Sequence, residues 1–550
     1  MNGRDHRKVG FWFFLLWAGW VVARPVEFSG SATLQGNAEF ISGDTLRKPY
    51  TNLTFTLSPT LTVFGIPITT DILLSTMESD LRQALNKVRI GIDPISLIRQ
   101  KLPVPGFMQY LPNIDVGTFS PSYSPLTVSG VAITGFGIEY QPWKVYLAGA
   151  GGRTQRAIEG SDTTEPTYKR TLYAGKFGLG KKEASHLYFS LLYAHDDSNS
   201  IERNWQIYQP DTSEPADTIE VVRPQENYVL GMDFSLSLFE DAFRLDAEVA
   251  GAELTRDIRM DVENYKWVPD WAERILKPRL SSQYDFAFSA RPVLNIFETK
   301  VAGEVRMVGP GFVSLGAPSL RNDNLSYQVG VERSFIDNAV VISGSFNREQ
   351  DNLIGMKLST TTFAAYGFNL VLNFPNLPYL GLNYSPCFQR SGSLSDRSHN
   401  ISLNAGYSFE TGEVSHSPSI AVSYQKHNAT MTENNYSTFD LSFGHSFGFT
   451  FPLSLTFNIG YSHSAYSDSS VNLIATSLSP SYTLFNSWTS GLFLSGSFEK
   501  ANRRLDVGLN SSFPVWRIAD ATISLGRSIY RGQDGGYQEW RLAGGLTKGW

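Results

Sequence analysis

The chain has 550 residues, of which 42% are hydrophobic, 13% aromatic and 18% charged, and its formal net charge is −6. This composition is too apolar for a disordered chain, and the length allows several domains or one very large barrel. A mildly acidic chain gives no support for nucleic-acid binding, so we expect no nucleic acid among its partners. The single cysteine, Cys387, excludes an internal disulfide and a cysteine-based metal site.

The N-terminus has the pattern of a secretory signal peptide. Arg4, Arg7 and Lys8 precede an apolar run from Val9 to Ala23, which is short for a transmembrane helix and ends on small residues. We therefore predict a signal peptide over residues 1–23 and an exported domain over residues 24–550; an uncleaved anchor is the alternative. No other stretch approaches the length of a membrane-spanning helix, which excludes a helical membrane protein.

Segments with alternating apolar and polar residues begin directly after this run. Such alternation predicts β-strands with one apolar face. The predicted strands of the first quarter of the chain are Phe28–Ile41, Asn52–Val63, Ile68–Thr76 and Leu126–Gln141, with Lys87–Ile92 and Ile114–Phe119 as a further pair.

The strand pattern lapses between residues 78 and 112. Leu81, Leu85 and Val88 lie near helical spacing, and a second apolar cluster between Ile95 and Leu102 is followed by prolines. One interpretation is a short helical element that constricts or plugs a barrel lumen. The other is a structured loop outside the membrane. Large barrels occur both open and plugged, so both interpretations stay open.

Downstream of residue 144 the alternation is regular. In Phe439–Phe451, for example, aromatic and apolar residues alternate with Ser, Gly and Thr. These strands are about ten residues long, the length that crosses a bilayer when tilted, whereas strands of a soluble sandwich or propeller are nearer five or six. The small polar face predicts a wet lumen, and aromatics near the strand ends predict an outward aromatic girdle.

The predicted connections alternate between long and short, as in barrels with long extracellular loops and short periplasmic turns. The long ones are predicted at 157–167, 195–226, 256–281, 308–325, 349–361, 386–398, 426–437, 463–471 and 530–537. The short ones are predicted at Lys181-Lys182, Glu240-Asp241, Asn295-Ile296, Asp337-Asn338, Pro375-Asn376, Phe451-Pro452, Asn486-Ser487 and Pro514-Val515. Within the third long connection, Asp270 and Glu273 resemble a capping box for a helix that contains Trp271, either a lid or a helix on the barrel rim.

The last strand carries the candidate barrel-closing residues. Trp540, Leu542, Leu546 and Trp550 share one face, and Lys548 on this face departs from the apolar pattern. A chain that ends on such a strand resembles outer-membrane β-barrels, whose terminal strand is recognised by the barrel-insertion machinery.

No catalytic or metal site emerges from the sequence. His195, beside Asp196 and Asp197, is the only histidine–carboxylate cluster, and it is expected in a long solvated loop. These acidic residues lack the spacing of a known calcium loop. We expect no enzyme activity, no cofactor and no metal.

Several segments resemble a family of large, uncharacterised outer-membrane barrels of the Bacteroidetes, over about residues 26–260. They are Thr127–Val131, Gly135–Ile138, Gly151–Ala157, Tyr168–Ala174 and Pro224–Asn227. The resemblance implies a barrel in the outer membrane and brings no established activity or site residues.

The sequence therefore predicts an all-β fold, a single large transmembrane antiparallel β-barrel of roughly 24 to 26 strands. The leading functional hypothesis is a monomeric, porin-like channel or transporter for small solutes in the bacterial outer membrane, in contact with its lipid. The alternative is a non-conducting barrel that serves as an anchor or subunit of a secretion or surface-assembly complex, with periplasmic or surface partner proteins.

Overall fold

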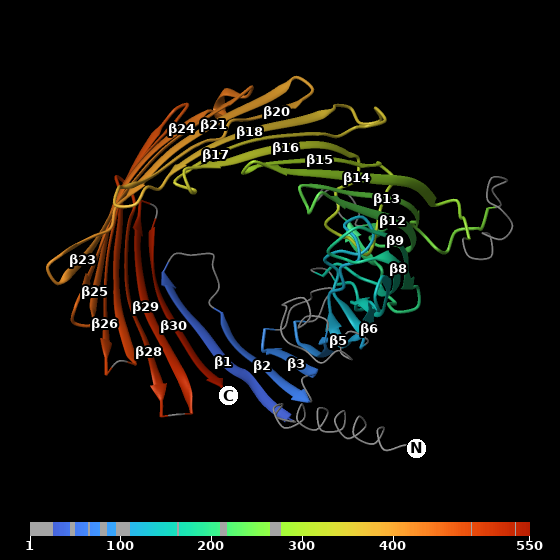
Figure 1. Ribbon diagram of the computed structural model, residues 1–550, viewed down its shortest axis with the longest axis horizontal. Coiled ribbons are helices and arrows are strands. Elements are labelled where there is room, and N and C mark those ends of the chain that lie inside the picture. Colours follow the sequence, from blue (N-terminus) through green and yellow to red (C-terminus); the bar gives the residue numbers. More distant parts are fainter. Residues whose placement is uncertain are drawn as a thin grey trace, which may run out of the picture.

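The computed structural model describes residues 26–43, 50–63, 66–77, 85–94, 111–161, 164–208, 217–263, 277–485, 487–516, 518–533 and 535–550. Within these residues the chain forms a closed antiparallel ring of 26 wall strands (Figure 1). Strands that follow one another in the sequence are neighbours in the ring. The predicted all-β barrel is confirmed, and the strand count lies within the predicted range.

The first part of the wall extends from the N-terminal strand to the middle of the chain. Its strands are β1 (Val26–Gly43), β2 (Thr51–Val63), β3 (Ile66–Ser75), β4 (Lys87–Ile92), β5 (Asn113–Phe119), β6 (Ile133–Tyr140), β7 (Val145–Gln155), β8 (Lys169–Gly180), β9 (His186–Asp197), β12 (Glu226–Leu238), β13 (Phe243–Thr255), β14 (Ser282–Ile296) and β15 (Thr299–Val308). β10 (Trp205–Tyr208) and β11 (Asp217–Glu220) form a separate hairpin between β9 and β12.

The second part of the wall completes the ring. Its strands are β16 (Asn324–Phe335), β17 (Val340–Gln350), β18 (Thr361–Leu372), β19 (Tyr379–Tyr384), β20 (Cys387–Ser391), β21 (Leu394–Gly406), β22 (Phe409–Thr411), β23 (Val414–Ala429), β24 (Tyr436–Phe449), β25 (Leu453–Tyr466), β26 (Ser470–Leu484), β27 (Trp488–Glu499), β28 (Arg503–Val515), β29 (Ala519–Gly532) and β30 (Gly535–Gly549). β19 and β20 share one wall position because Pro386, which lacks an N–H donor, interrupts the pairing with β18. β21 and β22 also share one wall position, since both pair with β23. A short 3₁₀ helix, η2 (Thr432–Asn434), joins β23 to β24.

The ring closes between the first and last strands. Ser31–Gly43 of β1 pairs antiparallel with Tyr537–Gly549 of β30, and the backbones of Gly30 and Trp550 exchange two hydrogen bonds of 3.1 Å. The Trp550 ring stacks on Phe28 with ring centroids 5.6 Å apart. The predicted terminal strand is therefore the last strand of the wall.

The two faces of the wall differ as the alternation predicts. Along β24 the outward side chains of Phe439, Leu441 and Phe443 are exposed apolar groups. The inward positions of β24 and β25 carry polar side chains that bond across the strands, such as Thr438 with Ser464 and Ser446 with Thr456. An apolar outer face and a hydrogen-bonded polar inner face suit a wall between lipid and water.

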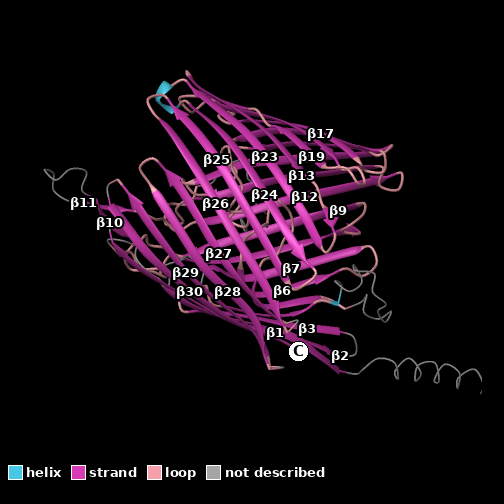
Figure 2. Ribbon diagram, turned by 90° about the vertical axis from the view of Figure 1, so that its left-hand side faces the viewer, coloured by secondary structure: helices cyan, strands magenta, loops and turns pink. Residues whose placement is uncertain are grey.

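The two ends of the barrel also differ (Figure 2). We call the end that carries Val26 and Trp550 the terminal end, and the opposite end the loop end. Short turns such as Phe297-Glu298 join strands at the terminal end, two residues beyond the predicted turn at Asn295-Ile296. At the loop end, the long connections 156–168, 198–225, 256–281, 309–323 and 351–360 agree with five of the predicted loops.

The other four loop predictions are wrong. The predicted loop 386–398 is a hairpin in which β20 and β21 meet at a two-residue turn. The predicted loops 426–437, 463–471 and 530–537 are shortened in the same way, because β23 to β26, β29 and β30 extend into them. These strand ends carry polar residues on both faces, so the alternation that marks the central part of each strand is lost although the backbone pairing continues.

The segment from residue 78 to 112 contains a wall strand. Lys87–Ile92 pairs with both β3 and β5, as the alternative prediction of a strand there required. The other parts of the segment, residues 78–84 and 95–110, lie outside the described residues, as do the predicted signal peptide 1–23 and the predicted helix at Trp271. A role of this segment as a plug stays a prediction.

Candidate functional site

Two connections at the loop end fold into the ring instead of away from it. We call residues 120–132, between β5 and β6, insert 1, and residues 309–323, between β15 and β16, insert 2. Both lie inside the ring beside β8, β9 and β12 (Figure 1). Leu126 of insert 1 has no exposed surface and Phe312 of insert 2 is 1% exposed. The predicted strand Leu126–Gln141 is therefore wrong in its first half, because residues 126–131 bury their apolar side chains inside the lumen.

The inserts form a dry core with one side of the wall. Under them many inward positions of the wall carry apolar side chains. The buried inward side chains are Leu172, Leu192, Ala194, Val229, Ala250, Ala252, Ala287 and Val308, which pack with Leu126, Val128, Val131 and Phe312. Burying one large apolar side chain stabilises a structure by about 1.5–3 kcal/mol, so packing alone holds the inserts firmly against the wall.

Backbone and amide hydrogen bonds join the inserts to each other and to the wall. The Ser129 N–H donates to the Gly316 carbonyl oxygen at 2.8 Å. Asn227 of β12, which is fully buried, donates from Nδ2 to the Val313 carbonyl oxygen at 2.9 Å and accepts from the Leu315 N–H at 2.9 Å. Because buried polar groups destabilise a structure unless they are paired, this amide both orients insert 2 and satisfies its backbone.

Charged side chains of the wall hold insert 1 in place. Glu248 of β13 accepts a hydrogen bond from the Ser124 hydroxyl and one from the Leu126 N–H at 3.2 Å. Lys176 of β8 donates from Nζ to the Tyr123 carbonyl oxygen at 2.5 Å and pairs with Asp233 at 2.8 Å. Charge-assisted hydrogen bonds are the stronger kind, and these fix the course of the insert backbone.

Glycines provide the room for this docking. A Cβ atom at Gly231 of β12 would lie 2.6 Å from Thr127 Cγ2 and 2.7 Å from Ser190 Oγ. A Cβ atom at Gly316 would lie 2.3 Å from Leu192 Cδ1. A larger residue at Gly231 would therefore collide with insert 1, and a larger residue at Gly316 would collide with Leu192 of the wall.

The loop between β17 and β18 clamps insert 2 at its C-terminal end. The Asp323 carboxylate accepts hydrogen bonds from the Asn352 N–H at 3.1 Å and the Leu353 N–H at 2.8 Å, and lies 2.6 Å from Lys357 Nζ. Burial alone would raise the pKa of Asp323, but the bonds from Lys357 and the two backbone groups lower it below its usual value. The same contacts, with Asp351, raise the pKa of Lys357.

The opposite side of the lumen is not covered by any described residue of the inserts. The apolar core cluster is confined to β5–β9, β12–β15 and the two inserts. A Cβ atom at the inward-facing Gly330 of β16 would meet nothing within 4 Å. In the part of the chain that the structure describes, the inserts therefore narrow the lumen from one side only.

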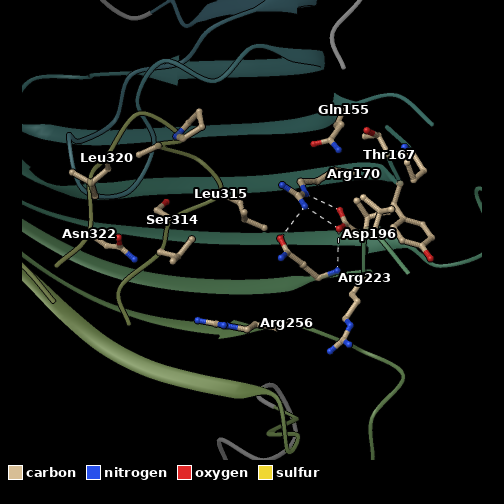
Figure 3. A pocket seen from close by; sticks show the side chains of 18 of the residues that line it. Gln155, Thr167, Arg170, Asp196, Arg223, Arg256, Ser314, Leu315, Leu320 and Asn322 are labelled. Carbon is tan, nitrogen blue, oxygen red and sulfur yellow. Dashed lines mark hydrogen bonds and ion pairs between the residues drawn. The ribbon is translucent and has the colours of Figure 1, made fainter. Parts of the chain in front are cut away.

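A pocket of about 670 Å³ lies between insert 2, the ends of β7, β8 and β9, the residues before β12 and the end of β13 (Figure 3). Arg170 of β8 makes a bidentate pair with Asp196 of β9, with N–O distances of 2.6 and 2.9 Å. Arg223 and Arg256 also line the pocket, and Phe312 and Leu315 form part of its apolar side. The pocket is at the mouth of the lumen at the loop end.

The residues singled out from the sequence lie elsewhere. Trp540, Leu542 and Leu546 are on the outward face of β30 and Trp550 directly follows this strand; all four are between 39% and 48% exposed. This position suits contact with lipid; recognition of these residues by the insertion machinery stays a prediction.

The histidine–carboxylate cluster does not form a site. The prediction that His195 lies in a loop is wrong, because β9 continues to Asp197. His195 lies 3.9 Å from Glu226, while the Asp196 carboxylate is occupied by Arg170. Among the described residues no group of three metal-ligating side chains comes together, and no helix is long and apolar enough to cross a membrane.

A closed antiparallel ring of 26 strands, apolar outside and largely polar inside, defines the class of large transmembrane β-barrels. No protein-family model matches the sequence, and neither does any curated protein, so the Bacteroidetes resemblance stays a prediction.

Solved barrels are similar only at low identity. OpdQ of Pseudomonas aeruginosa is 12% identical with a TM-score of 0.34, over 73% of this chain and 98% of that one. A BenF-like porin from Pseudomonas fluorescens is 9% identical with a TM-score of 0.31, over 63% and 96%. The translocation pore of the P pilus usher PapC is 10% identical with a TM-score of 0.38, over 95% and 99%. Likeness of this degree carries no argument about function.

Proposed function

We propose that this protein is a porin-like channel for small solutes in the bacterial outer membrane. The observation that carries the proposal is the asymmetry of the lumen. Two inserts are fixed in a dry core on one side, and this apolar core includes no residue of the wall from β16 to β30. A barrel that only anchored other proteins would not need an ordered constriction beside a free polar wall.

The proposed constriction is built to stay in place. Insert 2 is held by the core around Phe312, by the buried amide of Asn227 and by the clamp at Asp323. Solutes would pass between the inserts and the uncovered wall, where Ser, Thr and Asn side chains supply hydrogen-bonding groups.

Solute flux into liposomes tests the proposal. Refolded protein in liposomes should admit small sugars and exclude large ones, with a size limit that rises when residues 311–321 are replaced by a short Gly-Ser linker. The proposal would be refuted if neither the full-length protein nor the shortened variant let sugars enter the liposomes. Since Lys87–Ile92 is a wall strand, the predicted plug is tested separately by replacing residues 95–110 alone.

One observation favours the alternative, a subunit of a surface-assembly complex. Large apolar side chains protrude from turns at the terminal end with exposures of 67–88%: Phe239, Phe297, Ile336, Phe485 and Trp516. Their φ angles lie between 44° and 54°, a strained conformation for bulky residues. Such a rim could dock a periplasmic partner.

Replacement of these five residues by asparagine, which tolerates positive φ, tests the alternative. An assembly subunit would lose a co-purifying partner, whereas a channel would keep its solute flux unchanged.

A further inference from the structure

We propose that the pocket at the loop-end mouth binds a small organic anion that carries an apolar group. The inference rests on the proposed function, since it names the class of solute that would be captured at the entrance of the channel. The pocket's volume of about 670 Å³ is within the range of small-molecule sites, roughly 300–1,000 Å³.

The charge of the lining favours an anion. The charged lining residues are Arg170, Arg223, Arg256 and Asp196, three cations and one anion, which gives +2 in a chain whose formal net charge is −6. A site lined by one sign of charge with low-dielectric walls concentrates ions of the opposite sign.

The Arg170 guanidinium is not available to bind an anion, because it is already bonded to other side chains of the pocket lining. Its guanidinium makes two bonds to the Asp196 carboxylate and a third, of 3.2 Å, to Gln225 Oε1. The Gln225 N–H donates to Asp196 Oδ2 at 2.9 Å. The Asp196 side chain is 2% exposed, so this network is a fixed part of the wall, and Arg170 is a positioning residue.

Arg256 has binding capacity left. It is exposed, and its Nε donates to Gln283 Oε1 at 3.0 Å. No carboxylate of the described residues lies within 4 Å of its guanidinium, so its terminal N–H groups are available to a ligand. Arginine donors in this fork geometry match the oxygens of a carboxylate, sulfonate or phosphate.

Arg223 is only partly neutralised. Its Nε lies 3.6 Å from Glu220 Oε2, whereas Arg259 Nη2 lies 2.7 Å from Glu220 Oε1. Glu220 is therefore held mainly by Arg259, and the Arg223 side chain, which is 55% exposed, can turn toward a ligand. Figure 3 shows Arg223 and Arg256 on the same side of the Arg170–Asp196 pair.

The opposite part of the pocket selects for an apolar group. Phe312, Leu315 and Leu320 of insert 2 face the pocket together with Val221. An inorganic anion would leave the partly exposed side chains of Leu315, Leu320 and Val221 in contact with water, whereas an organic anion would cover them. Binding would also link the ligand to insert 2, because Phe312 belongs to the dry core as well.

The test uses benzoate as the probe and benzamide as its uncharged control, with saturation-transfer NMR on the refolded full-length protein in detergent. Benzoate should bind and benzamide should bind at least tenfold more weakly. The double variant R223Q/R256Q should lose at least tenfold in benzoate affinity, about 1.4 kcal/mol. The control variant R503Q/R531Q removes two arginines from the outward face of β28 and β29, and should bind benzoate like the unaltered protein.

Three results would overturn the proposal: no benzoate binding to the unaltered protein, equal binding of benzamide, or unchanged binding to R223Q/R256Q. The circular dichroism of each variant checks that the barrel is folded. Binding is measured at equilibrium and needs no conduction, so the two hypotheses fail separately. If the protein binds benzoate but passes no solute, the channel hypothesis is refuted and the anion site stands. If it passes solutes without binding benzoate, the anion-site hypothesis is refuted and the channel stands.

Discussion

Replacing Gly231 by valine should displace insert 1 while leaving the barrel wall closed. The first added carbon would lie 2.6 Å from Thr127 Cγ2 and 2.7 Å from Ser190 Oγ, well inside the contact distance of about 3.5–4.0 Å. Overpacking of this kind typically costs about 1–3 kcal/mol. The contact with Ser190 lies within the wall, but the contact with Thr127 lies between wall and insert, and strain there should lower the ratio of docked to undocked insert by about 5- to 150-fold.

Two assays report the displacement. Single-channel recordings of Gly231→Val should show more frequent or larger open steps than those of the unaltered protein. Chymotrypsin should cleave after Tyr123, in insert 1, at a faster rate. Gly330→Val is the matched control, since Gly330 also faces the lumen but its Cβ would meet nothing within 4 Å. Unchanged conductance and unchanged cleavage in Gly231→Val would refute the reasoning that insert 1 is a docked constriction.

Three further predictions concern insert 2 and the closure of the ring. Asn227→Ala leaves the backbone of insert 2 without its partner, at a cost of about 1–3 kcal/mol, and trypsin should then cleave faster after Arg321; an unchanged rate would contradict the role of the amide. The pKa of Asp323 is lowered in the folded state, so its stabilisation of loop 351–360 is fully present above the ordinary carboxyl pKa of about 3.9 and is lost as the pH falls through the lowered value. Hydrogen exchange in this loop should therefore accelerate between pH 5 and pH 2 beyond its intrinsic rate, and Asp323→Asn should abolish the pH dependence. Trp550→Ala removes the stacking on Phe28 and should lower the stability to urea by about 0.5–1.5 kcal/mol, whereas an unaltered midpoint would mean that the contact contributes nothing.

The wall was predictable because its physics is periodic. The central part of each strand must be apolar toward lipid and polar toward water, so apolar and polar residues alternate along the sequence with a period of two. Lys87–Ile92 was predicted at its observed bounds, and the turn at Asp337-Asn338 is where the pattern placed it. The prediction failed where the constraint is absent. Beyond the membrane, strands such as β20 and β21 continue with polar residues on both faces. Because the alternation is lost there, the sequence pattern predicts a loop.

The inserts were missed because their contacts are distant in sequence. Asn227 forms hydrogen bonds with the backbone of residues 313 and 315, and Ser129 with that of Gly316. No local sequence pattern predicts either contact. One signal was present in the wall itself. The inward positions of β9 change from Tyr188 and Ser190 to Leu192 and Ala194 toward the loop end. A strand that is apolar on both faces must be covered on both, and this could have indicated that something packs inside the lumen.

The pocket was beyond sequence reasoning for the same reason. Arg170, Arg223 and Arg256 come from three separate connections and strands, and only the closed ring brings them to one mouth. The sequence drew attention instead to His195 and its acidic neighbours. Asp196 is the one of them that matters for the pocket, as the partner that fixes Arg170.

The most direct test of the account is the single-channel conductance of the refolded full-length protein in a planar bilayer, compared with a variant whose residues 311–321 are replaced by a short Gly-Ser linker. Discrete steps are expected for the full-length protein and larger steps for the variant, because insert 2 narrows an open lumen. A bilayer that stays silent with both proteins would contradict the channel, and equal steps from both would contradict the constriction.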